Sequence, residues 1–190
     1  MKLTTILACL AILISLPTYG ESKKNEVTLS YSQATLPQTA YLLGGVLGVA
    51  FTAGHFTFDD TVFLGALGVE YGRNVNDWFT YGGLITFDYM TSKTYTVDSE
   101  GVKTPNGHFN LGYMSLMPVT KFKWFSHPRF GMYSKIGAGI GFAFSDDGNI
   151  SFSAQLSPVC MQYGNESIRG VLELGYGMQG ILTIGIKKLF

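Results

Sequence analysis

Apolar and polar residues alternate along most of this chain, and the period of two constrains the fold more than any other feature. Within residues 78–91, for example, Ile85 and Phe87 alternate with Thr86 and Asp88. In an extended strand, successive side chains point to opposite faces, so alternation gives one apolar and one polar face. The sequence therefore predicts an all-β protein.

Eight segments are long enough to serve as strands. We expect them at residues 26–34, 62–73, 78–91, 109–122, 130–144, 150–163, 168–178 and 180–190. The apolar face of the fourth segment includes Phe109, Leu111 and Tyr113, and that of the sixth includes Cys160. Near Pro118 the alternation blurs, and we expect a β-bulge there because proline cannot donate to a strand ladder.

The composition suits a barrel whose apolar face contacts lipid. Glycine accounts for 24 of the 190 residues and aromatic residues for 14%. Between residues 21 and 190, no apolar stretch reaches the roughly 20 residues that a spanning helix needs. Only helices and closed barrels pair all of their backbone polar groups within lipid. The sequence therefore predicts an eight-stranded antiparallel transmembrane β-barrel over residues 21–190, apolar outside and polar inside.

The start of the chain predicts export. Residues 1–20 combine Lys2, an apolar run from Leu3 to Leu16, and small residues before a cut after Gly20. This is the pattern of a cleaved signal peptide. We expect it to be removed.

The end of the chain predicts the membrane. The last segment ends at Phe190, and Ile184 and Ile186 share its apolar face. A chain with an export signal and a final strand closed by an aromatic residue resembles Gram-negative outer-membrane barrels, in which that strand is read by the barrel-assembly machinery. We expect these three residues to form the assembly signal, and the cell outer membrane and its lipid to be the surroundings of the barrel.

The connections between the predicted strands alternate in length. Short turns are expected at one end of the barrel, and outer loops near residues 35–61, 92–108, 145–149 and 177–180. Residues 41–51 are too apolar for a free loop. They could form a short helix against the barrel or the outer leaflet, an extension of the first strand, or half of a further hairpin that would make ten strands. We favour the helix.

Several short motifs, in this order and spacing, resemble the small outer-membrane β-barrel domain family. They are Leu67–Tyr71 (LGVEY), Met132–Gly139 (MYSKIGAG), Leu156–Pro158 (LSP), Glu173–Gly177 (ELGYG) and Gly180–Leu182 (GIL). The resemblance covers most of residues 26–190 and implies an eight-stranded antiparallel barrel. Lys188 departs from the family pattern, in which the final strand usually carries an apolar or aromatic residue at that position.

The polar faces of the predicted strands carry six charged residues. We expect a lumen charge network of Glu70, Asp88, Lys135, Arg169, Glu173 and Lys187. The lumen of an eight-stranded barrel is just wide enough for side chains to fill, and buried charges need partners. We therefore expect these groups to pair with one another. The alternative is a narrow ion path lined by the glutamates and lysines.

No motif indicates catalysis, a cofactor or a metal. Lysine and arginine number 13, as do aspartate and glutamate, so no basic surface is predicted to bind nucleic acid. The three histidines, His55, His108 and His127, lie in no catalytic pattern with a serine. We expect a non-enzymatic, porin-like membrane barrel with a structural or surface-contact role and a polar lumen filled by side chains. The alternatives are a small-solute or ion channel and an outer-leaflet lipid-modifying enzyme.

Overall fold

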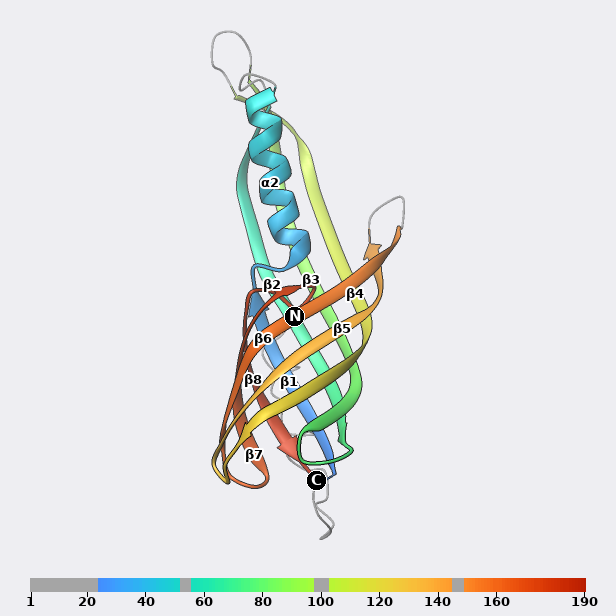
Figure 1. The fold of residues 1–190 in the computed structure, drawn as a ribbon. Helices are drawn as coiled ribbons and strands as arrows, with labels where there is room; N and C mark the ends of the chain where they lie inside the picture. The colour runs from blue at the N-terminus through green and yellow to red at the C-terminus, as the bar shows by residue number, and fades with distance from the viewer. Residues whose placement is uncertain (1–23, 52–55, 98–102, 145–148) are drawn as a thin grey trace.

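The chain forms a closed antiparallel barrel of eight strands in a computed structural model (Figure 1). The structure describes residues 24–51, 56–97, 103–144 and 149–190. Each strand pairs with its neighbours in sequence, and the first pairs with the last to close the sheet. The strands are β1 (Asn25–Gln33), β2 (Phe56–Asn74), β3 (Phe79–Val97), β4 (Lys103–Ser126), β5 (Phe130–Phe144), β6 (Ile150–Gly164), β7 (Ile168–Gly177) and β8 (Leu182–Leu189). The predicted eight-stranded antiparallel barrel is confirmed.

One wall of the barrel is much taller than the other. β2 and β3 each have 19 residues and β4 has 24, whereas β1, β7 and β8 have 9, 10 and 8. The tall strands rise together beyond the rest of the barrel (Figure 1). The prediction of a loop over residues 92–108 is therefore wrong for residues 92–97 and 103–108, which continue β3 and β4. Threonine, tyrosine and valine near the end of β3 favour strands, and the two strands pair almost to their tips.

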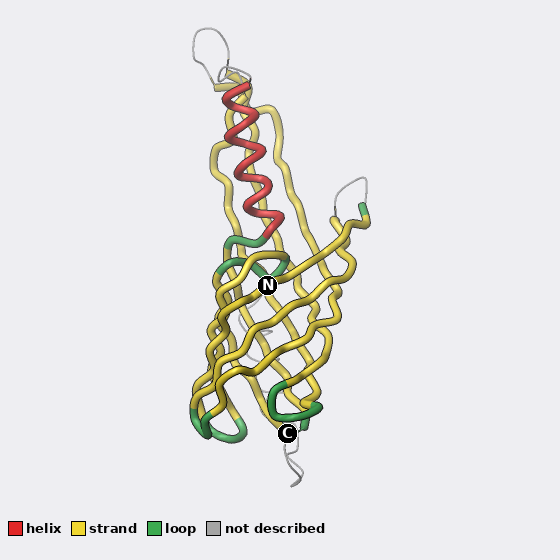
Figure 2. The backbone as a smooth tube through the Cα atoms, in the orientation of Figure 1, coloured by secondary structure: helices red, strands yellow, loops and turns green. Residues whose placement is uncertain are grey.

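A helix, α2 (Leu36–Phe51), occupies most of the predicted loop 35–61, and residues 56–61 already belong to β2. The helix interpretation is confirmed, and the helix begins earlier than expected because Thr35 and Gln38 form a capping box. The Gln38 backbone N–H donates to Thr35 Oγ1 at 3.3 Å, and Gln38 Oε1 accepts from the Thr35 backbone N–H at 3.4 Å. Figure 2 shows α2 standing above the barrel beside the tall strands. Within the described residues, no helix has the length and apolarity to cross a membrane.

The bulge expected at Pro118 is absent. β4 keeps a continuous register with β3 through the pair Gly83–Pro118, and its irregularity against β5 lies between Lys123 and Phe125 instead. The outward orientation predicted for Tyr113 is also wrong, since its side chain is buried and bonded to Ser151. The alternation of β4 looked blurred because some of its inward side chains are themselves apolar.

The outward orientation predicted for Cys160 is wrong as well, because a bulge in β6 reverses the alternation. Lys135 of β5 pairs with Ser157, whereas Tyr133 pairs with Cys160. Three steps along β6 thus match two along β5, which shifts the following side chains to the other face. Cys160 is fully buried in the lumen and unpaired.

The polarity of the barrel is the reverse of that of a water-soluble protein. Aliphatic side chains on its outer face are 43–56% exposed, including Val69, Ile85, Leu116, Ile136, Ile140, Leu156, Leu174, Ile184 and Ile186. Near the short turns, the rings of Trp78 and Phe122 stack with centroids 6.3 Å apart, and those of Phe125 and Phe130 lie 5.8 Å apart. Farther from the turns, Phe87 and Phe144 make another ring contact, at 6.4 Å. Most of the buried side chains are instead polar or charged.

Candidate functional site: a charge network inside the barrel

Six charged side chains meet inside the barrel and form the candidate site. Three are carboxylates and three are ammonium groups, so the cluster is neutral as a whole. Each comes from a different strand and is at most 2% exposed. They are Glu26, Glu70, Lys121, Lys135, Glu173 and Lys187. Burial of this degree is sustainable only because every charge has a partner.

The first part of the network joins β8, β1 and β4. Lys187 Nζ lies 3.2 Å from Glu26 Oε1, which lies 2.5 Å from Lys121 Nζ. Lys187 also donates to Gln162 Oε1 at 3.0 Å. The ring of Tyr133 contacts both cations, with its centroid 4.7 Å from Lys187 Nζ and 5.3 Å from Lys121 Nζ. Aromatic faces attract cations within about 6 Å, so Tyr133 stabilises both ammonium groups.

The second part continues through β2, β5 and β7. Lys121 pairs with Glu70, whose Oε2 lies 3.2 Å from Lys135 Nζ, and Lys135 pairs in turn with Glu173. The hydroxyl of Tyr133 donates to Glu173 Oε1 at 2.5 Å. The ion pairs therefore form one continuous chain across the lumen, to which six of the eight strands contribute.

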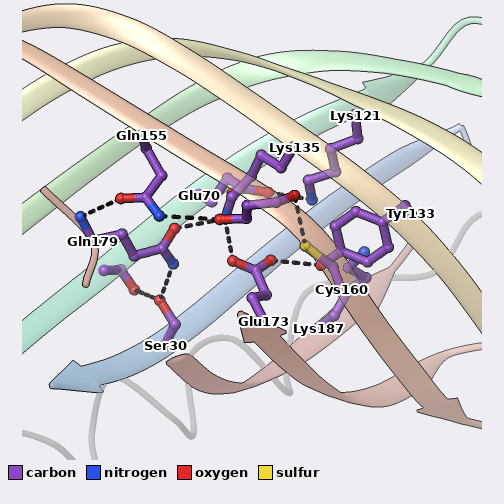
Figure 3. Close-up of polar contacts among 12 residues, drawn as sticks. Ser30, Glu70, Lys121, Tyr133, Lys135, Gln155, Cys160, Glu173, Gln179 and Lys187 are labelled. Atoms are coloured by element: carbon purple, nitrogen blue, oxygen red, sulfur yellow. Dashed lines mark hydrogen bonds and ion pairs between the residues drawn. The ribbon is translucent and has the colours of Figure 1, made fainter. Parts of the chain in front are cut away.

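The connection between β7 and β8, predicted as an outer loop, folds into the barrel and caps this chain. Gln179 accepts a hydrogen bond from Lys135 Nζ at 2.6 Å and donates to Ser30 Oγ at 3.2 Å. Its backbone N–H donates to Gln155 Oε1 at 2.8 Å. Figure 3 shows the two glutamines on one side of the ion pairs. Gly180 permits this inward turn because its φ of +112° is strained for other residues.

Apolar side chains fill a further part of the lumen. A cluster of buried residues consists of Leu84, Tyr113, Met117, Val119 and Met178. Leu36, the first residue of α2, packs against it. The lumen is thus occupied both by paired charges and by an apolar cluster.

Two of the charges predicted for the network lie apart from it. Asp88 is buried, but it accepts hydrogen bonds from the Thr35 hydroxyl and, at 2.7 Å, from Gln38 Nε2, so it anchors the start of α2. Arg169 donates to the backbone carbonyls of Asn165 and Pro128, each at 3.2 Å, close to the short turns. The structure brings the other four together: Glu70, Lys135, Glu173 and Lys187.

Sequence reasoning missed two members of the network. Glu26 has the same alternation as Thr28 and Ser30, both buried on the polar face of β1, so its orientation could have been predicted. Lys121 has the same alternation as Ser115, but apolar inward residues between them hid the pattern. No signal in the sequence indicates which strands face one another across the lumen.

The predicted assembly signal lies at the seam between the first and last strands. Ile184 and Ile186 are exposed on the outer face. Phe190 and Asn25 exchange two backbone hydrogen bonds of 2.9 Å. The last residue of the chain therefore takes part in closing the barrel.

The three histidines are the remaining candidate catalytic residues of the sequence. His127 is exposed in a short turn, whereas the side chains of His55 and His108 are not among those that the structure describes. The predicted signal peptide, residues 1–20, and residues 145–148 of a predicted loop also lie outside the described residues. Among the described residues, no group of three or more potential metal ligands comes together. No family model matches the chain, and no curated protein is significantly similar to it.

Proposed function

We propose that this protein is an integral outer-membrane β-barrel with a closed lumen, and that it acts as a structural or surface-contact element rather than as an enzyme. The observation that carries the proposal is the reversed polarity of the barrel. Aliphatic side chains are exposed outside, while charged side chains are buried inside. In water this arrangement is unfavourable, whereas in lipid it satisfies both surfaces.

The aromatic residues support the same surroundings. Trp78 and Trp124 are exposed at the end of the barrel that carries the short turns. Tryptophan and tyrosine concentrate at membrane–water interfaces, and short turns are periplasmic in outer-membrane barrels. This orientation directs α2 and the tall strands away from the cell.

The filled lumen supports a closed barrel. The ion-pair chain and the apolar cluster occupy the interior, and Gln179 caps the network with hydrogen bonds. The polar lining also motivates a second candidate, a small-solute or ion channel, in which the same charges would line a water path.

The test is to refold the chain into lipid and measure both insertion and conductance. A band that migrates differently before and after boiling reports an inserted barrel. We expect such a band together with no steady single-channel current. Steady current would favour the channel, and the absence of a heat-modifiable form would contradict the membrane barrel itself.

Assembly through the last strand can be tested in cells. We propose that the barrel-assembly machinery reads the end of β8, so deletion of Phe190 should reduce the amount of protein in the outer membrane. Normal insertion of the shortened chain would count against this signal. Refolding of the same variant in vitro separates loss of recognition from loss of folding.

A further inference from the structure

The face of α2 that turns away from the tall wall is aliphatic and exposed. Leu42, Leu43, Val46 and Leu47 are 50–67% exposed. These four residues, the α2 stripe, lie on one side of the helix because their spacing follows its turns. On another side, the ring of Tyr41 meets that of Phe63 on β2 edge-on, with centroids 6.5 Å apart.

The N-terminal end of α2 contacts the barrel at two strands, β3 and β7. Asp88 of β3 binds the first turn through Thr35 and Gln38. Thr39 Oγ1 lies 3.4 Å from the hydroxyl of Tyr176, an exposed residue near the end of β7. Thr39 lies one turn before the α2 stripe on the same side of the helix. This contact therefore makes the stripe continuous with the apolar outer face of the short wall, which is formed by β1, β7 and β8.

The short wall is at the lower limit for crossing a membrane. A spanning strand needs about 9–11 residues, and β1, β7 and β8 have 9, 10 and 8. From Leu42 to Leu47 the α2 stripe adds about 7.5 Å of apolar height above this wall, given a rise of about 1.5 Å per helical residue. The tall wall needs no such extension.

The charge pattern limits what the stripe can contact. No charged residue lies between Glu26 and Asp59. Helices that bind membrane surfaces electrostatically carry lysine and arginine on their polar face, and α2 carries none. Its contact must therefore be with uncharged, apolar groups.

We propose that the α2 stripe lies against the acyl chains at the outer edge of the membrane and completes the apolar height of the short wall. This inference rests on the proposed membrane location. In this arrangement α2 is an interfacial helix that sets how deeply the short wall of the barrel lies in the outer leaflet. Its stripe contacts lipid and does not bind a partner protein.

The experiment attaches a nitroxide to single cysteines in full chains that also carry Cys9→Ser and Cys160→Ser. The labelled variants are Leu43→Cys on the stripe, Lys93→Cys at an exposed position of β3 and Ile136→Cys on the outer face of β5. Each is refolded into dioleoylphosphatidylcholine vesicles. Collisions with oxygen report lipid, and collisions with a water-soluble nickel chelate report water.

We expect the ratio of oxygen to nickel collisions at residue 43 to approach that at residue 136 and to exceed that at residue 93 several-fold. A ratio at residue 43 equal to that at residue 93, with residue 136 in lipid, would overturn the inference and leave the stripe to a protein partner. If residue 136 is itself in water, the proposed membrane location fails instead. Leu47→Cys serves as a second stripe position if Leu43→Cys does not fold.

Discussion

The charge network in the lumen and helix α2 above it differ in where their side chains find partners. In the network, every carboxylate meets an ammonium group, and all six side chains are buried. In α2 there is no charged residue, and the four aliphatic side chains of the α2 stripe are exposed. The closed lumen must supply a partner for every polar group itself, whereas α2 can leave its partners to the surroundings. The network should therefore be sensitive to any single loss, and α2 should be tolerant.

The largest effect is expected for Lys135→Met. Lys135 pairs with two carboxylates, Glu70 and Glu173, and donates to Gln179. Its removal leaves buried charges uncompensated, which destabilises proteins by about 3–5 kcal/mol. Urea unfolding of the refolded barrel measures this loss. Lys24→Met, at an exposed position, is the matched control and should change stability by less than about 0.5 kcal/mol. Equal midpoints for the two variants would mean that the network does not stabilise the barrel.

A smaller and more local effect is expected for Asp88→Ala. The side chains of Thr35 and Gln38, both buried, would lose their shared acceptor. Unsatisfied buried donors destabilise by about 1–3 kcal/mol. Since this acceptor fixes only the start of α2, hydrogen exchange should accelerate in α2 while β5 to β8 stay protected. Asp77→Ala, in an exposed turn, should alter neither region. Faster exchange throughout the barrel would show that Asp88 belongs functionally to the network after all.

Loss of the helix cap should destabilise the protein less than Asp88→Ala does. Thr35→Ala removes the hydroxyl that receives the Gln38 backbone N–H and donates to Asp88, but Asp88 keeps its hydrogen bond from Gln38 Nε2. Loss of such a cap destabilises by about 1 kcal/mol. Thr35→Ser keeps the oxygen and should restore the exchange protection of α2. If both variants behave alike, the methyl group of Thr35, rather than its hydroxyl, holds the helix.

The same contrast explains how much the sequence could predict. The barrel and its strand positions follow from alternation, which is a local property, and β5 begins and ends at the predicted residues. The inward positions of Glu70, Lys135 and Glu173 follow from it too. Alternation fails where the lumen is apolar, as at Met117, and where a bulge reverses it, as before Cys160. The ion pairs themselves depend on which strands face one another across the closed barrel, and no local pattern carries that information.

The smallest expected effect has the opposite sign. Gly44 lies inside α2, and a Cβ built there meets nothing within 4 Å. Alanine in a helix interior is favoured over glycine by about 0.5–1 kcal/mol, so Gly44→Ala should slow hydrogen exchange in α2. Gly68→Ala provides the comparison in the lumen, where the new Cβ would lie 2.5 Å from Ser30 Oγ and 3.8 Å from Gln179 Nε2. That variant should unfold at lower urea concentration. If Gly44→Ala is instead the more damaging of the two, the glycine serves a close contact of α2, and the helix is not the tolerant region that its exposure indicates.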